Sequence, residues 1–352
     1  MTRKVFVGPV QIGGGAPVSV QTMTNTDTRD IAATLAQIRA MAAAGAELVR
    51  VSVYDDACAQ AVRALVDASP VPLVADIHFD HRLAIKSVEN GIAKVRINPG
   101  NIGGEAHVRQ LADCLKMHGV PCRIGVNSGS VEKEILAKYG GVTPEGMVES
   151  GLNHARMLER AGFEDIVMSF KATDVSKMVS ACRLAAKACG YPQHIGVTES
   201  GTADVGIVKS AVGIGALLLD GIGDTVRVSL SGDPVQEVPA ALSILRACGL
   251  RRDGVEIISC PTCGRTCIDV EGIARRVRRE TADIRVPIKV AVMGCVVNGP
   301  GEAREADVGV AGGRDGGALF VKGEAPRSVK GDLAAALISE VRRMAQRHDG
   351  HC

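Results

Sequence analysis

Short β-rich segments in which one face is apolar recur through the first 230 positions of the chain. Helical patterns separate them, such as DIAATLAQIRAMAAAG, where Ile31, Leu35 and Ile38 share one face and Gly45 is placed to end the helix. The eight segments are VSVQTM from 18, ELVRVSV from 47, PLVADIH from 72, KVRINPG from 94, CRIGVNS from 122, DIVMSFKA from 165, HIGVTES from 194 and DTVRVSL from 224.

Eight alternations of strand and helix over about 250 residues are typical of a (β/α)8 TIM-like barrel. A doubly wound open sheet is the alternative. It would carry a glycine-rich phosphate loop after its first strand, and VSVQTMTNTDTRD has none. We therefore expect an α/β chain with a barrel over residues 1–250, followed by a smaller domain.

The alternation within each segment predicts which side chains face the barrel lumen, because successive strand residues point to opposite sides. Arg50 and Ser52 lie opposite Val49, Val51 and Val53. The same alternation gives a polar lumen set near the C-terminal strand ends, where barrel enzymes keep their active sites. That set is Arg50, Asp76, His78, Arg96, Arg123, Asn127, Ser169, Lys171, Arg227, Ser229 and Ser231. The segment from 194 is weaker, since Glu199 shares its side with Ile195 and Val197.

Four arginines and a lysine in this set exceed the two acids, Asp76 and Glu199, that could balance them. An unpaired buried charge costs several kcal/mol, so the excess predicts an anionic ligand. Converging guanidinium groups suit a phosphate or diphosphate, whose oxygens they bind in pairs. The alternative is that some of these arginines pair with acids on neighbouring loops.

Residues 251–352 predict a small α+β domain after the linker LRRDG. Strands VEIIS and PIKVAVMG are each followed by a cysteine-bearing loop, so both loops can project from the same end of a sheet. A helix, IDVEGIARRVRRETA, lies between them. Two short strands, DVGVAG and ALFVKG, and a C-terminal helix complete the domain.

The two loops carry Cys260, Cys263 and Cys267 in the first, and Cys295 and Glu302 in the second. Zinc prefers two close cysteine pairs, and here it would need Cys267 as fourth ligand. A thioredoxin-like pair would leave Cys295 unexplained. The spacing C-x-x-C-x-x-x-C reverses that of radical enzymes that cleave S-adenosylmethionine. An iron–sulfur cluster with three thiolates and a replaceable oxygen ligand, such as Glu302, accounts for most of these residues.

The formal net charge of +2 and the scarcity of aromatic side chains argue against nucleic-acid binding. No apolar run approaches a membrane span and no signal peptide is legible, so we expect a cytoplasmic protein. Eleven cysteines in that compartment argue against a disulfide framework.

ISCPTCGRT followed by VMGCVVNGPGE closely resembles the bacterial 4-hydroxy-3-methylbut-2-enyl diphosphate synthases of the methylerythritol phosphate route. The resemblance extends through VQTMTNTDT, ADIHF, RIGVNSGS, GVTESG and DTVRVSLSGDP, and covers essentially the whole chain. It implies reductive ring opening and dehydroxylation of 2-C-methyl-D-erythritol 2,4-cyclodiphosphate, with two electrons delivered through a [4Fe-4S] cluster.

The resemblance also implies roles for individual residues. The cluster ligands would be Cys260, Cys263, Cys295 and Glu302, and Glu199 would contact the reacting hydroxyl and move a proton. The diphosphate cradle would comprise Arg50, Arg96, Arg123, Asn127, Lys171 and Ser229. Cys267 lies outside the family's ligand set and is read as an inert thiol, the rival being that it displaces Glu302.

Two partners follow from the same resemblance: flavodoxin or ferredoxin as electron donor, and a second copy of the chain. The family's two-domain form is a head-to-tail homodimer in which one chain's cluster caps the other chain's barrel. A zinc-stabilised barrel that binds a phosphorylated metabolite without redox chemistry is the alternative function.

Overall fold

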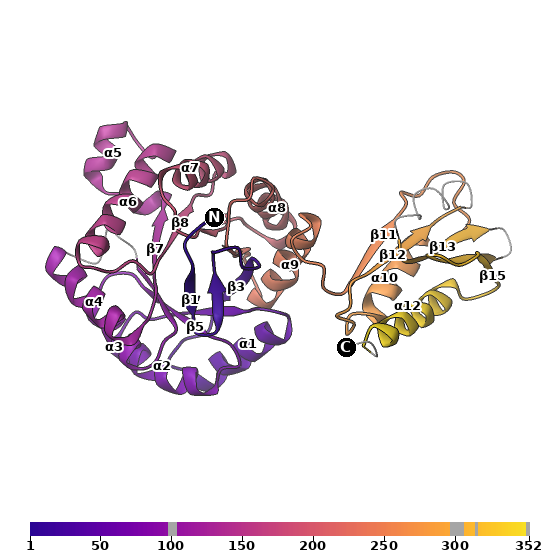
Figure 1. Cartoon of the computed structure of the whole chain (residues 1–352), viewed down its shortest axis with the longest axis horizontal. Helices are drawn as coiled ribbons and strands as arrows, with labels where there is room; N and C mark the ends of the chain where they lie inside the picture. The colour runs from indigo at the N-terminus through magenta and orange to yellow at the C-terminus, as the bar shows by residue number, and fades with distance from the viewer. Residues whose placement is uncertain (98–103, 296–305, 314–315, 350–352) are drawn as a thin grey trace. The chain divides into compact units, whose positions relative to one another are not determined.

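The computed structural model describes residues 1–97, 104–295, 306–313 and 316–349. The chain divides into two compact units, Met1–Arg251 and Arg252–Cys352 (Figure 1). Within the described ranges, no helix is both long and apolar enough to cross a membrane.

The first unit is a closed barrel of parallel strands, in the order β8-β7-β6-β5-β4-β3-β10-β9. A bridge between Met168 and Gln193 joins β8 to β9 and closes the ring. The predicted barrel is therefore confirmed. Its strands are β3 (Ser19–Met23), β4 (Leu48–Ser52), β5 (Leu73–Ile77), β6 (Lys94–Ile97), β7 (Cys122–Asn127), β8 (Ile166–Lys171), β9 (His194–Ile195) and β10 (Thr225–Val226).

Helices cover the outside of the ring, where the apolar strand residues such as Val49 and Val51 join their buried core. Asp30, Asp55 and Asp174 cap three of these helices by accepting a hydrogen bond from a first-turn amide. The α-helices of the unit are α1 (Ile31–Ala43), α2 (Asp56–Ala68), α3 (His81–Glu89), α4 (Glu105–His118), α5 (Lys133–Tyr139), α6 (Pro144–Arg160), α7 (Val175–Ala188), α8 (Ala203–Leu219) and α9 (Glu237–Ala247).

A hairpin that the sequence did not predict, β1 (Val5–Val7) and β2 (Val10–Ile12), lies at the N-terminal end of the barrel strands. Val7 and Ile12 pack on Leu48, the first residue of β4. The adjoining chain is fixed to the segments that enter β9 and β10: the Arg3 amide donates to the Gly190 carbonyl at 2.7 Å, and the Thr2 hydroxyl donates to Asp224 at 2.6 Å.

The second unit is a five-stranded mixed sheet, in the order β11-β12-β13-β14-β15. The first three strands are parallel, and the last two run antiparallel. The α+β prediction is confirmed, although β15 was not foreseen. The elements are β11 (Val255–Ser259), α10 (Val270–Glu280), β12 (Ile288–Met293), β13 (Val308–Gly313), β14 (Gly316–Val321), β15 (Arg327–Val329) and α12 (Leu333–Asp349). Apolar residues of both helices and of the sheet form one core.

Candidate active site

The barrel brings the predicted cations together along neighbouring strands. In the strand register, Arg96 of β6 is level with Asp76 of β5 and with Arg123 of β7, and Asn127 of β7 is level with Lys171 of β8. Arg96, Arg123 and Lys171 are each less than a tenth exposed. The predicted alternation thus places a dense group of positive side chains inside the ring.

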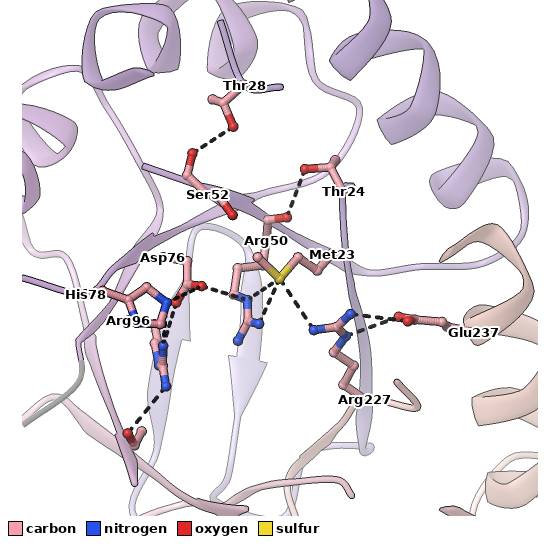
Figure 2. A network of polar contacts seen from close by, with 11 residues as sticks. Met23, Thr24, Thr28, Arg50, Ser52, Asp76, His78, Arg96, Arg227 and Glu237 are labelled. Atoms are coloured by element: carbon pink, nitrogen blue, oxygen red, sulfur yellow. Dashed lines mark hydrogen bonds and ion pairs between the residues drawn. The ribbon is translucent and has the colours of Figure 1, made fainter. Parts of the chain in front are cut away.

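Asp76 is the centre of a buried polar network in this lumen (Figure 2). Its carboxylate accepts a hydrogen bond from Arg96 Nη1 at 2.9 Å and lies 3.8 Å from Arg50 Nε. His78 Nε2 lies 3.2 Å from both the Asp76 carboxylate and Arg96 Nη1. One carboxylate therefore interacts with two guanidinium groups and an imidazole.

The electrostatics of the lumen follow from this imbalance. Burial raises the pKa of Asp76, but Arg50, the His78 contact and Arg96 outweigh it and hold that pKa well below its ordinary value. Burial lowers the pKa of Arg50 to about 10, against the pull of Asp76. Asp76 is consequently ionised, and its single negative charge is divided among its neighbours.

Arg227 pairs with an acid, as the alternative to an anionic ligand predicted for some of the lumen arginines. Its Nε and Nη2 donate to the two carboxylate oxygens of Glu237, at 3.1 and 3.2 Å. Glu237 begins α9 and is 2% exposed. Arg227 is thus balanced by an acid from a following helix. Its Nη1 lies 3.4 Å from the sulfur of Met23, which Arg50 also contacts, at 2.8 Å from Nη2 (Figure 2).

Arg123 and Lys171 have no such balance. Nε and Nη2 of Arg123 are buried and donate no hydrogen bond to any described residue. Burial, reinforced by Arg50 and Arg96, lowers the pKa of Arg123 well below its ordinary value. Burial and Arg123 do the same to the pKa of Lys171. Buried donors usually have partners, so these two side chains can accept an anion without breaking an existing bond.

Three other predicted residues lie at the C-terminal ends of the strands. Glu199 is exposed, and its carboxylate accepts a hydrogen bond from the Thr173 hydroxyl at 3.2 Å. Its φ of +50° is left-handed and breaks the strand alternation that grouped it with Ile195 and Val197. Ser130 Oγ accepts from the Asn127 amide at 3.2 Å. The Ser229 carbonyl accepts from the Ser200 hydroxyl.

Several lumen residues escaped the sequence reasoning. Lys94 and His194 are fully buried inside the ring, and Lys94 shares the strand face of Arg96. The alternation would have found Lys94, which stands at the very start of its segment. Gly125 also matters for the packing of the lumen, because a Cβ there would lie 2.5 Å from Arg96 Nε and force that side chain to shift. The sequence alone could not show this contact, because it depends on the path that the Arg96 side chain takes across β7.

In the second unit, the two cysteine-bearing loops follow adjacent parallel strands, β11 and β12. Ser259, which ends β11, is level with Val292 of β12, so Cys260 and Cys295 follow the same edge of the sheet. The Gly294 amide donates to Cys260 Sγ at 3.0 Å, and the Cys267 amide donates to the Gly294 carbonyl at 2.9 Å. The expectation that both loops project from one end of the sheet agrees with this register.

Among the described residues, no three His, Cys, Asp or Glu side chains converge as a metal site. Glu302 lies outside the described residues, and Cys263 and Cys267 are exposed. The donor set nevertheless suits a cluster, because thiolate sulfurs bind iron and amide donors to such sulfurs are usual around clusters. The contact between the Gly294 amide and Cys260 Sγ is of this kind.

Comparison with known proteins covers both units. A family model described as the GcpE TIM-barrel domain matches residues 2–242, and one described as the GcpE protein C-terminal domain matches residues 256–343.

Relatives named 4-hydroxy-3-methylbut-2-en-1-yl diphosphate synthase (flavodoxin) align over almost the full length. The protein of Caldanaerobacter subterraneus subsp. tengcongensis is 53% identical, over 98% of each chain. That of Geobacter sulfurreducens is 56% identical, over 99% of each chain. That of Lawsonia intracellularis is 54% identical, over 97% of this chain and 96% of its own.

Proposed function

The chain belongs to the GcpE family, and from this premise we propose how its own residues carry out the family's reaction. It is a 4-hydroxy-3-methylbut-2-enyl diphosphate synthase, an oxidoreductase of isoprenoid precursor biosynthesis. The reaction opens the ring of 2-C-methyl-D-erythritol 2,4-cyclodiphosphate. Two electrons and two protons enter, and one oxygen leaves as water.

The barrel, residues 1–250, binds the cyclic diphosphate. The observation that carries this assignment is the excess of buried cations in the lumen, where Arg123 and Lys171 have no acidic partner among the described residues. A diphosphate supplies both the charge and the oxygen acceptors that these groups lack. Arg50, Arg96, Asn127 and Ser229 complete the cradle, with Asp76 holding Arg50 and Arg96 in place.

Glu199 transfers a proton at the reacting carbon–oxygen bond. Its carboxylate lies beyond β9, next to Thr173 beyond β8, at the strand ends where barrel chemistry occurs. Its left-handed backbone supports this role, since strained residues cluster at functional sites.

Residues 251–352 carry the electrons. Cys260, Cys263, Cys295 and Glu302 would hold a [4Fe-4S] cluster, which would supply these electrons singly from flavodoxin, the donor named for the relatives, or from ferredoxin. The Gly294 amide stabilises negative charge on the Cys260 sulfur, which it already contacts. Cys267 is not a ligand, and its sulfur donates to the Arg265 carbonyl at 3.3 Å.

The working form is a head-to-tail homodimer in the cytoplasm, in which the second unit of one copy completes the barrel mouth of the other. Analytical ultracentrifugation tests this assembly. A dimer is expected, and a strict monomer with full activity would contradict it.

Anaerobic purification followed by a turnover assay tests the function. The expected result is a brown protein, with about four iron and four sulfide per chain, that converts the cyclic diphosphate when supplied with reduced flavodoxin. A colourless protein with one zinc per chain and no turnover would favour the zinc-stabilised binding protein instead.

A further inference from the structure

Lys94 is a buried amine for which the proposed chemistry has no role. It is the first residue of β6 and shares the lumen face with Arg96, two positions along the strand. Its side chain is fully buried, and Nζ makes no hydrogen bond to any described residue. A buried polar group without a partner costs free energy, so this position calls for a physical explanation.

The surroundings of Lys94 offer no balancing charge. The buried acids among the described residues of the barrel unit are Asp76 and Glu237, and both already contact arginines. His194, on β9, is also fully buried, and its Nε2 has no described partner. The other titratable groups facing this region are Arg50 of β4, Arg96 of β6, Cys122 and Arg123 of β7, Lys171 of β8 and Arg227 after β10.

Complete burial, with no hydrogen-bond partner for Nζ among the described residues, disfavours the charged form of the amine. Burial, followed by repulsion from Arg123 and Arg50, lowers the pKa of Lys94 well below its ordinary value. The same causes, burial first and then Arg123, lower the pKa of His194. A second positive charge beside Arg123 would be buried, with no free acid among the described residues to stabilise it.

Binding of a diphosphate would favour the protonated form of Lys94 over the neutral form. Arg123 and Arg50, which repel a charge on Lys94, are the groups assigned to the anion. A negative ligand held by these side chains makes the lumen favourable for a further cation. An amine able to accept a proton lies within reach of that field.

We propose that Lys94 is a charge-switching positioning residue, neutral in the free chain and protonated when the diphosphate binds. The proton comes from solvent and joins the Nζ lone pair, and no other bond forms or breaks. The new ammonium group strengthens the positive wall behind the anion. This inference rests on the proposed function, because it takes the diphosphate-binding site as its starting point.

Two consequences distinguish this role from a structural one. Substrate binding takes up a proton, so the Kd rises by about tenfold per pH unit for each proton taken up. Replacing Lys94 with an apolar side chain of similar length removes an unpartnered polar group, so it stabilises the free chain while weakening binding. A lysine that merely supported the fold would not combine these effects.

Isothermal titration calorimetry of the anaerobic full-length protein measures the proton uptake. The cyclic diphosphate and inorganic pyrophosphate are each titrated in buffers of different ionisation enthalpy, and the slope gives the protons taken up. The wild type is expected to take up about one proton more than Lys94→Met. That variant should also have a Kd about tenfold higher and a higher Tm.

Lys187→Met is the matched control, because Lys187 is exposed on α7, away from the lumen face. It should leave proton uptake and Kd unchanged. Lys94→Gln, which is polar but uncharged, replaces Lys94→Met if the latter does not fold. The difference between variant and wild type isolates Lys94 from protons taken up by Lys171 or His194.

Equal proton uptake in wild type and Lys94→Met, for a ligand that both bind, would overturn the inference and leave the proposed function intact. Binding of pyrophosphate with proton uptake, but no turnover of the cyclic diphosphate, would overturn the proposed function and keep the inference. Failure of the wild type to bind either ligand would overturn both.

Discussion

The barrel lumen and the cysteine-bearing segments differ in how far protein contacts alone fix their functional groups. In the lumen, Asp76 and Arg96 are buried, Arg50 is mostly buried, and contacts of 2.9 to 3.8 Å join both arginines to Asp76. In the second unit, Cys263 and Cys267 are exposed, and the sulfur of Cys260 is held by one amide at 3.0 Å. Protein contacts therefore position the lumen residues, whereas the described contacts leave two of the cysteines exposed.

The largest expected effect comes from breaking the lumen network. Asp76→Asn leaves Arg50 and Arg96 without their buried acid, which we expect to cost about 3–5 kcal/mol of unfolding free energy. Turnover should be lost with it. Urea unfolding of the full chain checks the stability.

The control for Asp76→Asn is Asp67→Ala, which removes an exposed partner of Arg63 at 3.0 Å. Exposed pairs of this kind contribute about 0–1 kcal/mol. Equal losses in the two variants would show that the lumen network is no more important for stability than a surface ion pair.

The second prediction concerns the proposed cluster ligands. Replacing one of them should abolish activity but change the stability of the barrel little. Cys263→Ala and Glu302→Ala should each abolish turnover, because each removes a proposed cluster ligand. Iron analysis and the barrel's thermal transition report the two effects separately. The matched variant Cys267→Ala should keep the iron and most activity, and loss of the cluster in that protein would refute the ligand assignment.

The third effect tests how tightly the lumen is packed. Gly125→Ala places a methyl group 2.5 Å from Arg96 Nε, so Arg96, which donates to Asp76, must shift. We expect the KM for the cyclic diphosphate to rise about tenfold, which corresponds to about 1.4 kcal/mol of binding. Gly129→Ala is the control, since nothing lies within 4 Å of its added carbon. Unchanged kinetics in Gly125→Ala would show that the lumen adapts easily.

The smallest effect is a pH dependence of stability. Because the pKa of Lys94 is lowered in the folded chain, the unfolded chain binds the extra proton, and the penalty shrinks as pH rises toward about 10.4. The gain in Tm of Lys94→Met over wild type should therefore be largest near neutral pH and vanish above that value.

Scanning calorimetry of the two proteins side by side is required for this comparison. Burial raises the pKa values of Cys122 and Cys182 to about 12, so both thiols destabilise the fold as pH rises past their ordinary range. The difference between the proteins cancels that contribution. A gain in Tm that does not change with pH would contradict the neutral amine.

The sequence predicted the lumen well because the two-residue period of a strand is a local property. It placed Arg50, Arg96, Arg123 and Lys171 on one side without knowledge of the barrel's closure. It could not predict that Glu237 of α9 pairs with Arg227, because helix-to-strand contacts are not encoded in strand alternation. Strand alternation does not apply at Glu199, because the backbone there is left-handed.

For the cysteines, sequence spacing predicted which end of the sheet they leave, and the parallel pairing of β11 with β12 agrees. The ligand set itself came from resemblance to a family rather than from geometry, and it stays a prediction. Spacing cannot choose between Cys267 and Glu302, since both are close enough along the chain to the other thiols. Iron analysis of the variants is what separates them.

The β1–β2 hairpin gives the lumen a direction. Val7 and Ile12 pack on Leu48, and hydrogen bonds join the adjoining chain to the segments that enter β9 and β10. These described residues cover the N-terminal end of the ring. If the diphosphate binds in the lumen as proposed, substrate and product enter and leave at the opposite, C-terminal end of the ring, and so does the proton taken up by Lys94. On the same proposal, product must leave through that end before the next diphosphate can enter.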